Sequence, residues 1–143
     1  FLFSRKKFKE EKLNIEAKVN FTGRIHNSEL PKLLQKSNFY ISMPITEGVS
    51  ASLFEAMATH CYPIVTDVVG NRSWITHRKN GQLIAINNYQ MLADELIWAF
   101  DNSVHRNEAV IENRKFVEEN YTWEKRGKKI AEFISQTVSE SRT

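Results

Sequence analysis

The chain has 143 residues, of which 41% are hydrophobic, and its formal net charge is +3 at pH 7. This is enough apolar material for a single domain, over residues 1–143, with a sizeable core. No apolar run approaches the ~20 residues that a membrane-spanning helix needs, and no signal-peptide pattern opens the chain. The charge is too mild to indicate a nucleic-acid partner.

The chain has one cysteine, Cys61, so no internal disulfide can form. It lies between His60 and Tyr62 at the head of an apolar run, where we expect a buried small hydrophobe rather than a reactive thiol. A single free cysteine fits a reducing compartment, and we expect a cytoplasmic protein. The four histidines share no metal-ligand spacing, so the sequence predicts no metal site.

Predicted strands and helices alternate along most of the chain. In chain order they are a helix end over 3–13, a strand over 17–21, a helix over 27–35, a strand over 39–43, a helix over 50–59, a strand over 63–66, a helical turn over 71–75, a strand over 82–85, and helices over 89–100, 104–119 and 123–137. Residues 139–143 are expected to form a disordered tail. This alternation favours an α/β domain, a doubly wound Rossmann-like parallel sheet with helices on both faces.

Two glutamates frame the turn between the strand over 39–43 and the helix that follows it. Glu47 is followed directly by Gly48, and Glu55 comes eight positions after Glu47, inside the helix. Such a turn, at the carboxyl end of a strand, is where open α/β sheets bind ligands, and the helix N-terminus favours a phosphate. Carboxylates that faced a phosphate would repel it. The pair therefore indicates hydrogen bonds to hydroxyl groups, as a sugar or ribose would supply.

Each of these residues also has a purely structural interpretation. Ser52 and Glu55 have the spacing of a capping box, which would hold only the helix N-terminus. Glu47 could be a solvated loop acid, and Gly48 could be a turn residue with positive φ. The hydroxyl of Ser50 could cap the helix.

The stretch from Met43 to Ala58 resembles the donor-site motif of the family 4 retaining glycosyltransferases, the group 1 transferases with a two-domain GT-B fold. The resemblance covers about residues 19–134 and includes motifs on both sides of that stretch. These motifs are Val19-Asn-Phe-Thr-Gly-Arg-Ile25, Tyr62-Pro-Ile-Val-Thr-Asp67, Gly70-Asn71-Arg72, Asn80-Gly81-Gln-Leu-Ile84 and Tyr121-Thr-Trp123. The chain departs from the family at Ser73, where members often have a glutamate, so any role of that acid is lost here.

The resemblance implies a role for each site residue. Glu55 would bind the ribose hydroxyls, and Glu47 would contact the transferred sugar and, as the catalytic residue, stabilise positive charge on its ring. Gly23, Arg24 and Ile25 would lie beside the base, although a tight turn with a solvated Arg24 explains them equally well. The donor sugar and diphosphate would be bound by Glu47, Gly48, Val49, Ser50, Ala51 and Ser52.

The resemblance also implies a function, the donor-binding half of a retaining glycosyltransferase of the hexosyltransferase type. The parent would transfer a sugar from a nucleoside diphosphate to a hydroxyl acceptor, in polysaccharide or glycolipid biosynthesis. UDP is the expected nucleotide and GDP the next. GT-B enzymes need no metal, the chain has no Asp-x-Asp motif, and no cofactor is expected.

We interpret the chain as a fragment of a longer enzyme. It begins at Phe1, without the strand and the Gly-Arg…Lys-Gly loop that family members carry upstream. We therefore expect its own first strand and the N-terminal acceptor domain to belong to the missing part of the same polypeptide. We expect the fragment alone to be inactive.

Two alternative functions remain open. The same fold could serve a nucleotide-sugar epimerase or a phosphorylase, although nothing marks a pyridoxal-bearing lysine. The basic segments Arg5-Lys-Lys7, Lys125-Arg126 and Lys128-Lys129 could instead belong to a non-catalytic interaction module. They could also bring the parent to the anionic inner face of a membrane.

Overall fold

The computed structural model describes residues 20–140, and the chain divides into two compact units, Phe1–Leu30 and Pro31–Thr143. The prediction of a single domain stays a prediction. The helix end predicted over 3–13 and most of the strand predicted over 17–21 lie outside the described residues. Asn20 and Phe21 are not in a strand, because no neighbouring strand pairs with them among the described residues.

The described part of the first unit is a turn that leads into a short helix. Gly23 has a φ of 63°, a left-handed conformation that glycine adopts without steric cost. Further on, the backbone N–H of Glu29 donates to the carbonyl of His26 over 2.9 Å. This turn delays helix α2, which runs over Leu30–Leu34 and is shorter than the predicted 27–35.

The second unit is built on three parallel strands in the order β1-β2-β3, counting the described residues alone. They are β1 (Phe39–Ser42), β2 (Tyr62–Thr66) and β3 (Gln82–Ile84). In the register, Ile41 lies opposite Ile64, and Val65 lies opposite Leu83. All five positions of β2 are buried, as expected of a central strand that is covered on both faces.

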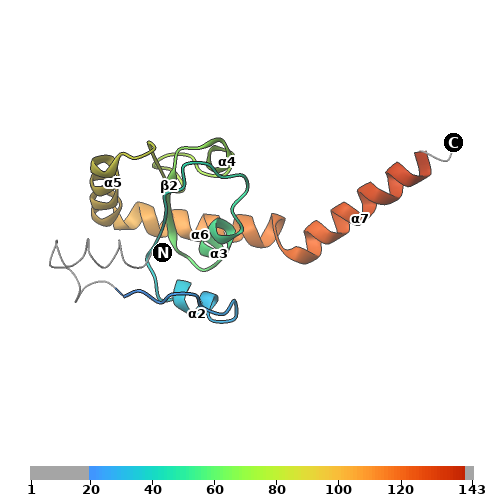
Figure 1. Cartoon of the computed structure of the whole chain (residues 1–143), viewed down its shortest axis with the longest axis horizontal. Helices are drawn as coiled ribbons and strands as arrows, with labels where there is room; N and C mark the ends of the chain where they lie inside the picture. The colour runs from blue at the N-terminus through green and yellow to red at the C-terminus, as the bar shows by residue number, and fades with distance from the viewer. Residues whose placement is uncertain (1–19, 141–143) are drawn as a thin grey trace. The chain divides into compact units, whose positions relative to one another are not determined.

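Helices cover both faces of the sheet, α3 (Ala51–Ala58) one face and α5 (Tyr89–Asp101) the other (Figure 1). The core on the α3 face contains Leu53, Met57, Val65, Ile75 and Val117. The core on the α5 face contains Tyr62, Ile64, Ile84, Ala99 and Ala109. Helix α6 (Ser103–Asn120) contributes to both cores and runs from α5 to α3. This arrangement confirms the predicted α/β class, with a parallel sheet between helices.

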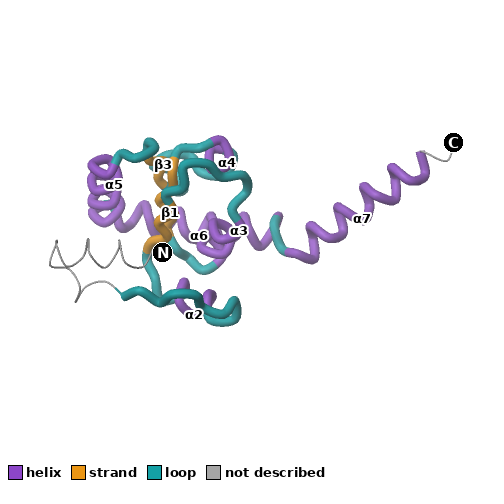
Figure 2. Tube along the Cα trace, viewed as in Figure 1, coloured by secondary structure: helices purple, strands orange, loops and turns teal. Residues whose placement is uncertain are grey.

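The loops that leave the carboxyl ends of the strands gather at one edge of this sheet (Figure 2). The first loop joins β1 to α3, and the second leads from β2 into α4 (Val69–Arg72). Helix α4 is the predicted helical turn, and it begins two residues before the predicted start. A parallel sheet places these connections together, because every strand ends at the same edge.

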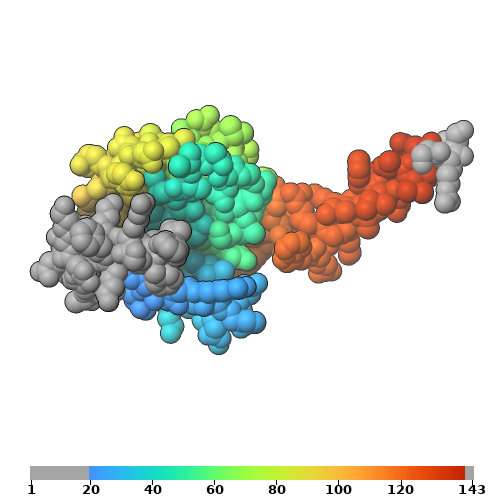
Figure 3. All heavy atoms as spheres, in the orientation of Figure 1, coloured from blue at the N-terminus to red at the C-terminus, as the bar shows by residue number. Residues whose placement is uncertain are grey.

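Helix α7 (Trp123–Glu140) has no buried residue and extends beyond the packed helices of its unit (Figure 3). None of the helices within residues 20–140 is long and apolar enough to span a membrane. The tail predicted from residue 139 is wrong for Ser139 and Glu140, which are helical. The hydroxyl of Ser139 donates to the carbonyl of Ser135 over 2.8 Å and supports the last helical turn. Residues 141–143 lie outside the described residues.

Candidate functional site

The turn after β1 and the turn after β2 touch each other through their backbones. A Cβ atom at Gly70 would lie 1.8 Å from the carbonyl oxygen of Gly48 and 2.4 Å from that of Glu47. No side chain fits at this approach, so position 70 requires glycine. The two turns meet because β1 and β2 are adjacent and parallel.

Gly48 faces open space. Its φ does not lie in the positive region, and a Cβ built on it would meet no described atom within 4 Å. The interpretation of Gly48 as a positive-φ turn residue is therefore wrong. Neither strain nor internal packing accounts for glycine here, whereas a ligand that approaches the backbone would need this space.

The N-terminus of α3 has no side-chain cap. Ser50 is the N-cap residue, but its side chain makes no capping hydrogen bond; its Oγ lies 3.0 Å from the Oγ of Ser52. The Oγ of Ser52 lies 2.7 Å from the hydroxyl of Tyr40 on β1. Ser52 is thus inside the helix, not before it, and both the capping box and the Ser50 cap are wrong. The first amides of α3 keep their hydrogen-bonding capacity for another acceptor.

Glu47 and Glu55 have no partner in the part of the chain that the structure describes. Glu47 is half-buried in the turn, and Glu55 is exposed on α3. Neither carboxylate takes part in any of the hydrogen bonds or ion pairs within residues 20–140. Glu55 comes four residues after Ala51 and three after Ser52, on the same helix face, and helical side chains lean toward the N-terminus. Both carboxylates are available to hydroxyl donors.

The turn after β2 contains an ion pair that sequence reasoning missed. Arg72 donates from Nε to Oδ1 of Asp67 over 2.6 Å and from Nη2 to Oδ2 over 3.2 Å. The hydrogen bonds from Arg72 are the main cause that holds the pKa of the Asp67 carboxyl below its usual value. The sequence places these residues in two separate motifs, and their spacing of five gives no helical-pair signal.

Asn71 holds this turn in place. Its side chain is buried, and its Nδ2 donates to the carbonyl of Thr66, the last residue of β2, over 2.8 Å. The turn therefore has a fixed geometry beside the Glu47–Gly48 backbone.

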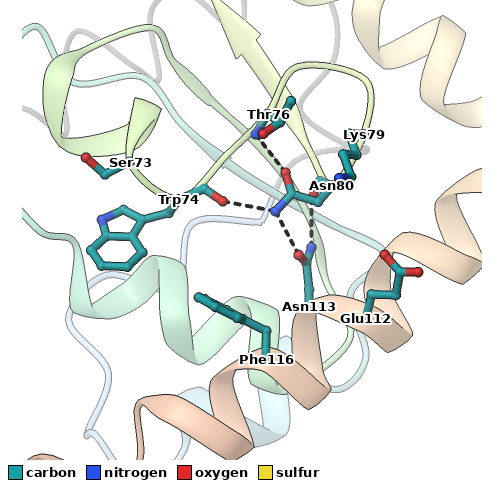
Figure 4. A pocket seen from close by; sticks show the side chains of 8 residues that line it. All are labelled: Ser73, Trp74, Thr76, Lys79, Asn80, Glu112, Asn113 and Phe116. Atoms are coloured by element: carbon teal, nitrogen blue, oxygen red, sulfur yellow. Dashed lines mark hydrogen bonds between the residues drawn. The ribbon is translucent and has the colours of Figure 1, made fainter.

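A pocket of about 210 Å³ lies between the 73–80 segment and α6 (Figure 4). Its lining residues are Ser73, Trp74, Thr76, Lys79, Asn80, Glu112, Asn113 and Phe116. Asn80 and Asn113 hydrogen-bond each other across it, Nδ2 of Asn113 to the carbonyl of Asn80 over 2.7 Å and Nδ2 of Asn80 to Oδ1 of Asn113 over 3.1 Å. These amides tie the segment to α6, and no predicted site residue lines the pocket.

The structure brings together the predicted residues from Glu47 to Glu55, on one turn and one helix. Gly23, Arg24 and Ile25 belong to the other unit; Gly23 has a positive φ, and Arg24 is exposed. Their contact with a base stays a prediction. Within residues 20–140, no three His, Cys, Asp or Glu side chains group in a way that could hold a metal ion.

Solved structures of other proteins share this fold. The C-terminal domain of the group 1 glycosyl transferase LpcC from Francisella tularensis matches with a TM-score of 0.75 and 23% identity, over 85% of this chain and 63% of that one. HepE from Anabaena, in complex with UDP-glucose, matches with a TM-score of 0.87 and 17% identity, over 94% of this chain and 36% of that one. TarM from S. aureus, in a complex that contains UDP, matches with a TM-score of 0.74 and 26% identity, over 83% of this chain and 24% of that one. The chain thus spans less than two thirds of each of these proteins.

None of the curated protein sequences compared with the chain matches it. A family model does: that of the glycosyl transferases group 1 matches residues 3–116. This range contains the three strands, the turn with Glu47 and Gly48, and the ion pair of Asp67 with Arg72. The chain belongs to the group 1 glycosyl transferases.

Proposed function

We propose that the chain is the donor-binding half of a retaining glycosyltransferase of family 4, with a nucleotide-sugar bound at the carboxyl edge of the sheet. The observation that carries the proposal is the open space at Gly48, which lies along the chain between Glu47 and Glu55, two carboxylates that have no partner within residues 20–140. The HepE complexes with UDP and with UDP-glucose, and the TarM complex with UDP, support a uridine nucleotide as the donor.

In the proposed complex, the diphosphate lies at the N-terminus of α3. Among the described residues, the N-cap Ser50 gives the first amides of that helix no side-chain acceptor, and the helix dipole favours an anion there. The absence of a side chain at Gly48 lets the backbone of residues 48–52 approach the sugar and phosphate oxygens. No metal or other cofactor is part of the proposal, because oriented amides and basic side chains can stabilise the leaving diphosphate.

The two carboxylates divide the donor between them. Glu55 accepts hydrogen bonds from the ribose hydroxyls, and Glu47 accepts them from the sugar. An oxocarbenium-like transition state is electron-poor, so the fixed charge of Glu47 lowers the barrier as positive charge develops on the ring. The turn at Gly23, Arg24 and Ile25 contacts the base.

The parent enzyme supplies the rest of the reaction. Its acceptor domain binds the hydroxyl that receives a hexose, in the synthesis of a polysaccharide or a glycolipid. We place the parent in the cytoplasm, at the inner face of the membrane, where the basic side chains of α7 can approach anionic headgroups.

The division of labour is tested by titrating the chain with UDP and UDP-glucose. Glu55→Gln should weaken the binding of both ligands by about 10- to 100-fold, which corresponds to the ~1.5–3 kcal/mol of a charged hydrogen bond. Glu47→Gln should spare UDP and weaken only UDP-glucose. The measurement is the dissociation constant from NMR chemical shifts, with GDP as the comparison for the base.

Glu108→Gln is the matched control, because Glu108 is an exposed acid on α6. Equal effects of the two site variants on plain UDP would refute the division. A non-catalytic interaction module would show no saturable shift with any nucleotide.

A further inference from the structure

The turn after β2 places a basic side chain, the guanidinium of Arg72, at the carboxyl edge of the sheet. The loops over 43–50 and 85–88 contain no lysine or arginine. Arg72, the last residue of α4, is the basic side chain within 67–72. Among the described loops at this edge, these two facts leave Arg72 as the fixed cation.

Arg72 belongs to the same turn that touches the Glu47–Gly48 backbone. Gly70 makes that contact, and Asp67 and Arg72 stand on either side of Gly70 along the chain. The hydrogen bonds between Asp67 and Arg72 close a loop around Gly70. The guanidinium is therefore tied to the turn that borders the open space at Gly48.

Asp67 orients the guanidinium without using all of its donors. Two of the five N–H groups go to Asp67, and the other three have no partner in the described part of the chain. The side chain is 59% exposed, so a ligand can reach it. A guanidinium group that is already oriented loses less conformational entropy when it binds an anion.

Stability alone is a weak explanation for the pair, since exposed ion pairs contribute only ~0–1 kcal/mol. Charge balance gives a better one. The site has two carboxylates, Glu47 and Glu55, that have no partner among the described residues, and an anionic ligand there needs a local cation. A guanidinium fork matches both phosphate and carboxylate oxygens.

We propose that Arg72, oriented by Asp67, binds an anionic group of the donor, either its diphosphate or the carboxylate of an acidic sugar. This inference rests on the proposed function. To that function it adds Arg72 as a residue that recognises the negative charge of the donor.

The test is a titration of the wild-type chain, Arg72→Gln and Arg72→Lys with uridine, UDP, UDP-glucose and UDP-glucuronic acid. If the anion is the diphosphate, Arg72→Gln weakens UDP about tenfold and leaves uridine unchanged. If it is the sugar carboxylate, Arg72→Gln weakens UDP-glucuronic acid about tenfold and leaves UDP and UDP-glucose unchanged. Arg72→Lys keeps the charge without the fork and recovers part of the lost affinity in either case.

Arg114→Gln is the matched control, because Arg114 also forms an exposed ion pair, with Glu118 on α6. Unchanged affinity of Arg72→Gln for all four ligands would overturn the inference. The proposed function would then still stand if Glu55→Gln weakens UDP. Failure of the wild-type chain to bind any of the nucleotides would overturn both.

Discussion

Tyr62 is a fully buried tyrosine whose hydroxyl has no hydrogen-bond partner among the described residues. The pKa of Tyr62 is raised to about 12, mainly by burial and then by nearby Glu95, while Arg106 and Arg78 lower it. The side chain supplies apolar volume to the core on the α5 face. Its hydroxyl therefore adds little to stability at neutral pH but makes ionisation costly.

Replacing Tyr62 with phenylalanine should therefore change stability in a pH-dependent way. At pH 7 the change should be small, because no hydrogen bond is lost. In the wild-type chain the unfolded tyrosine ionises near pH 10, before the folded one. The free energy of unfolding of the wild-type chain is thus unaffected by this ionisation below about pH 10 and falls as the pH rises toward 12, by up to ~2–3 kcal/mol.

Urea unfolding of both proteins from pH 7 to 11.5 measures this difference. Above pH 10 the free energy of unfolding of wild type should fall relative to that of Tyr62→Phe. Parallel stability curves over the whole range would mean that the Tyr62 hydroxyl is solvated in the folded state.

At the scale of elements, the 73–80 segment is fixed to α6 by paired asparagines. Asn113 is buried and exchanges two hydrogen bonds with Asn80, whose Oδ1 also accepts from the backbone of Thr76 over 2.7 Å. Figure 4 shows these amides between the segment and the helix. They join α6 to the chain that leads into β3.

Asn113→Ala should reduce the free energy of unfolding by about 1–3 kcal/mol, because it leaves the half-buried carbonyl of Asn80 without its donor. Asn120→Ala is the control on the same helix: Asn120 is exposed and bonds only the carbonyl of Phe116 within α6. Chemical denaturation of both variants gives the comparison. A loss no larger for Asn113→Ala than for Asn120→Ala would show that the pair does not hold the segment.

Within the whole molecule, this chain supplies one wall of the proposed active site. It should bind nucleoside diphosphate with a dissociation constant of ~0.1–1 mM, equivalent to roughly −4 to −5.5 kcal/mol. It should transfer no sugar, because orienting two reactants can contribute ~7–11 kcal/mol and one wall does not orient both. An NMR titration combined with a transfer and donor-hydrolysis assay measures both quantities. Turnover by this chain alone would contradict the proposal that its acceptor domain is needed.

The sequence by itself determined the α/β class and most element positions. The apolar run over 63–66 predicted a buried strand, found as Tyr62–Thr66, and the helix formers after Ser50 predicted α3. These signals are local, since burial on both faces and helix propensity are properties of neighbouring residues. The pattern around Glu47 and Glu55 likewise predicted a ligand site in one turn at the carboxyl edge of the sheet. The match to the group 1 family model agrees with the family resemblance of that pattern.

Only the tertiary structure decided what surrounds that turn. The capping box is wrong because Ser52 lies inside α3 and its hydroxyl contacts Tyr40 on β1. The requirement for glycine at Gly70 and the open space at Gly48 arise from the meeting of two turns, and the Asp67–Arg72 pair forms only when α4 folds back. Each of these contacts joins residues from different local signals. The packing of β1 against β2 brings the two turns together, and the other two contacts depend on how α3 and α4 fold back after their strands.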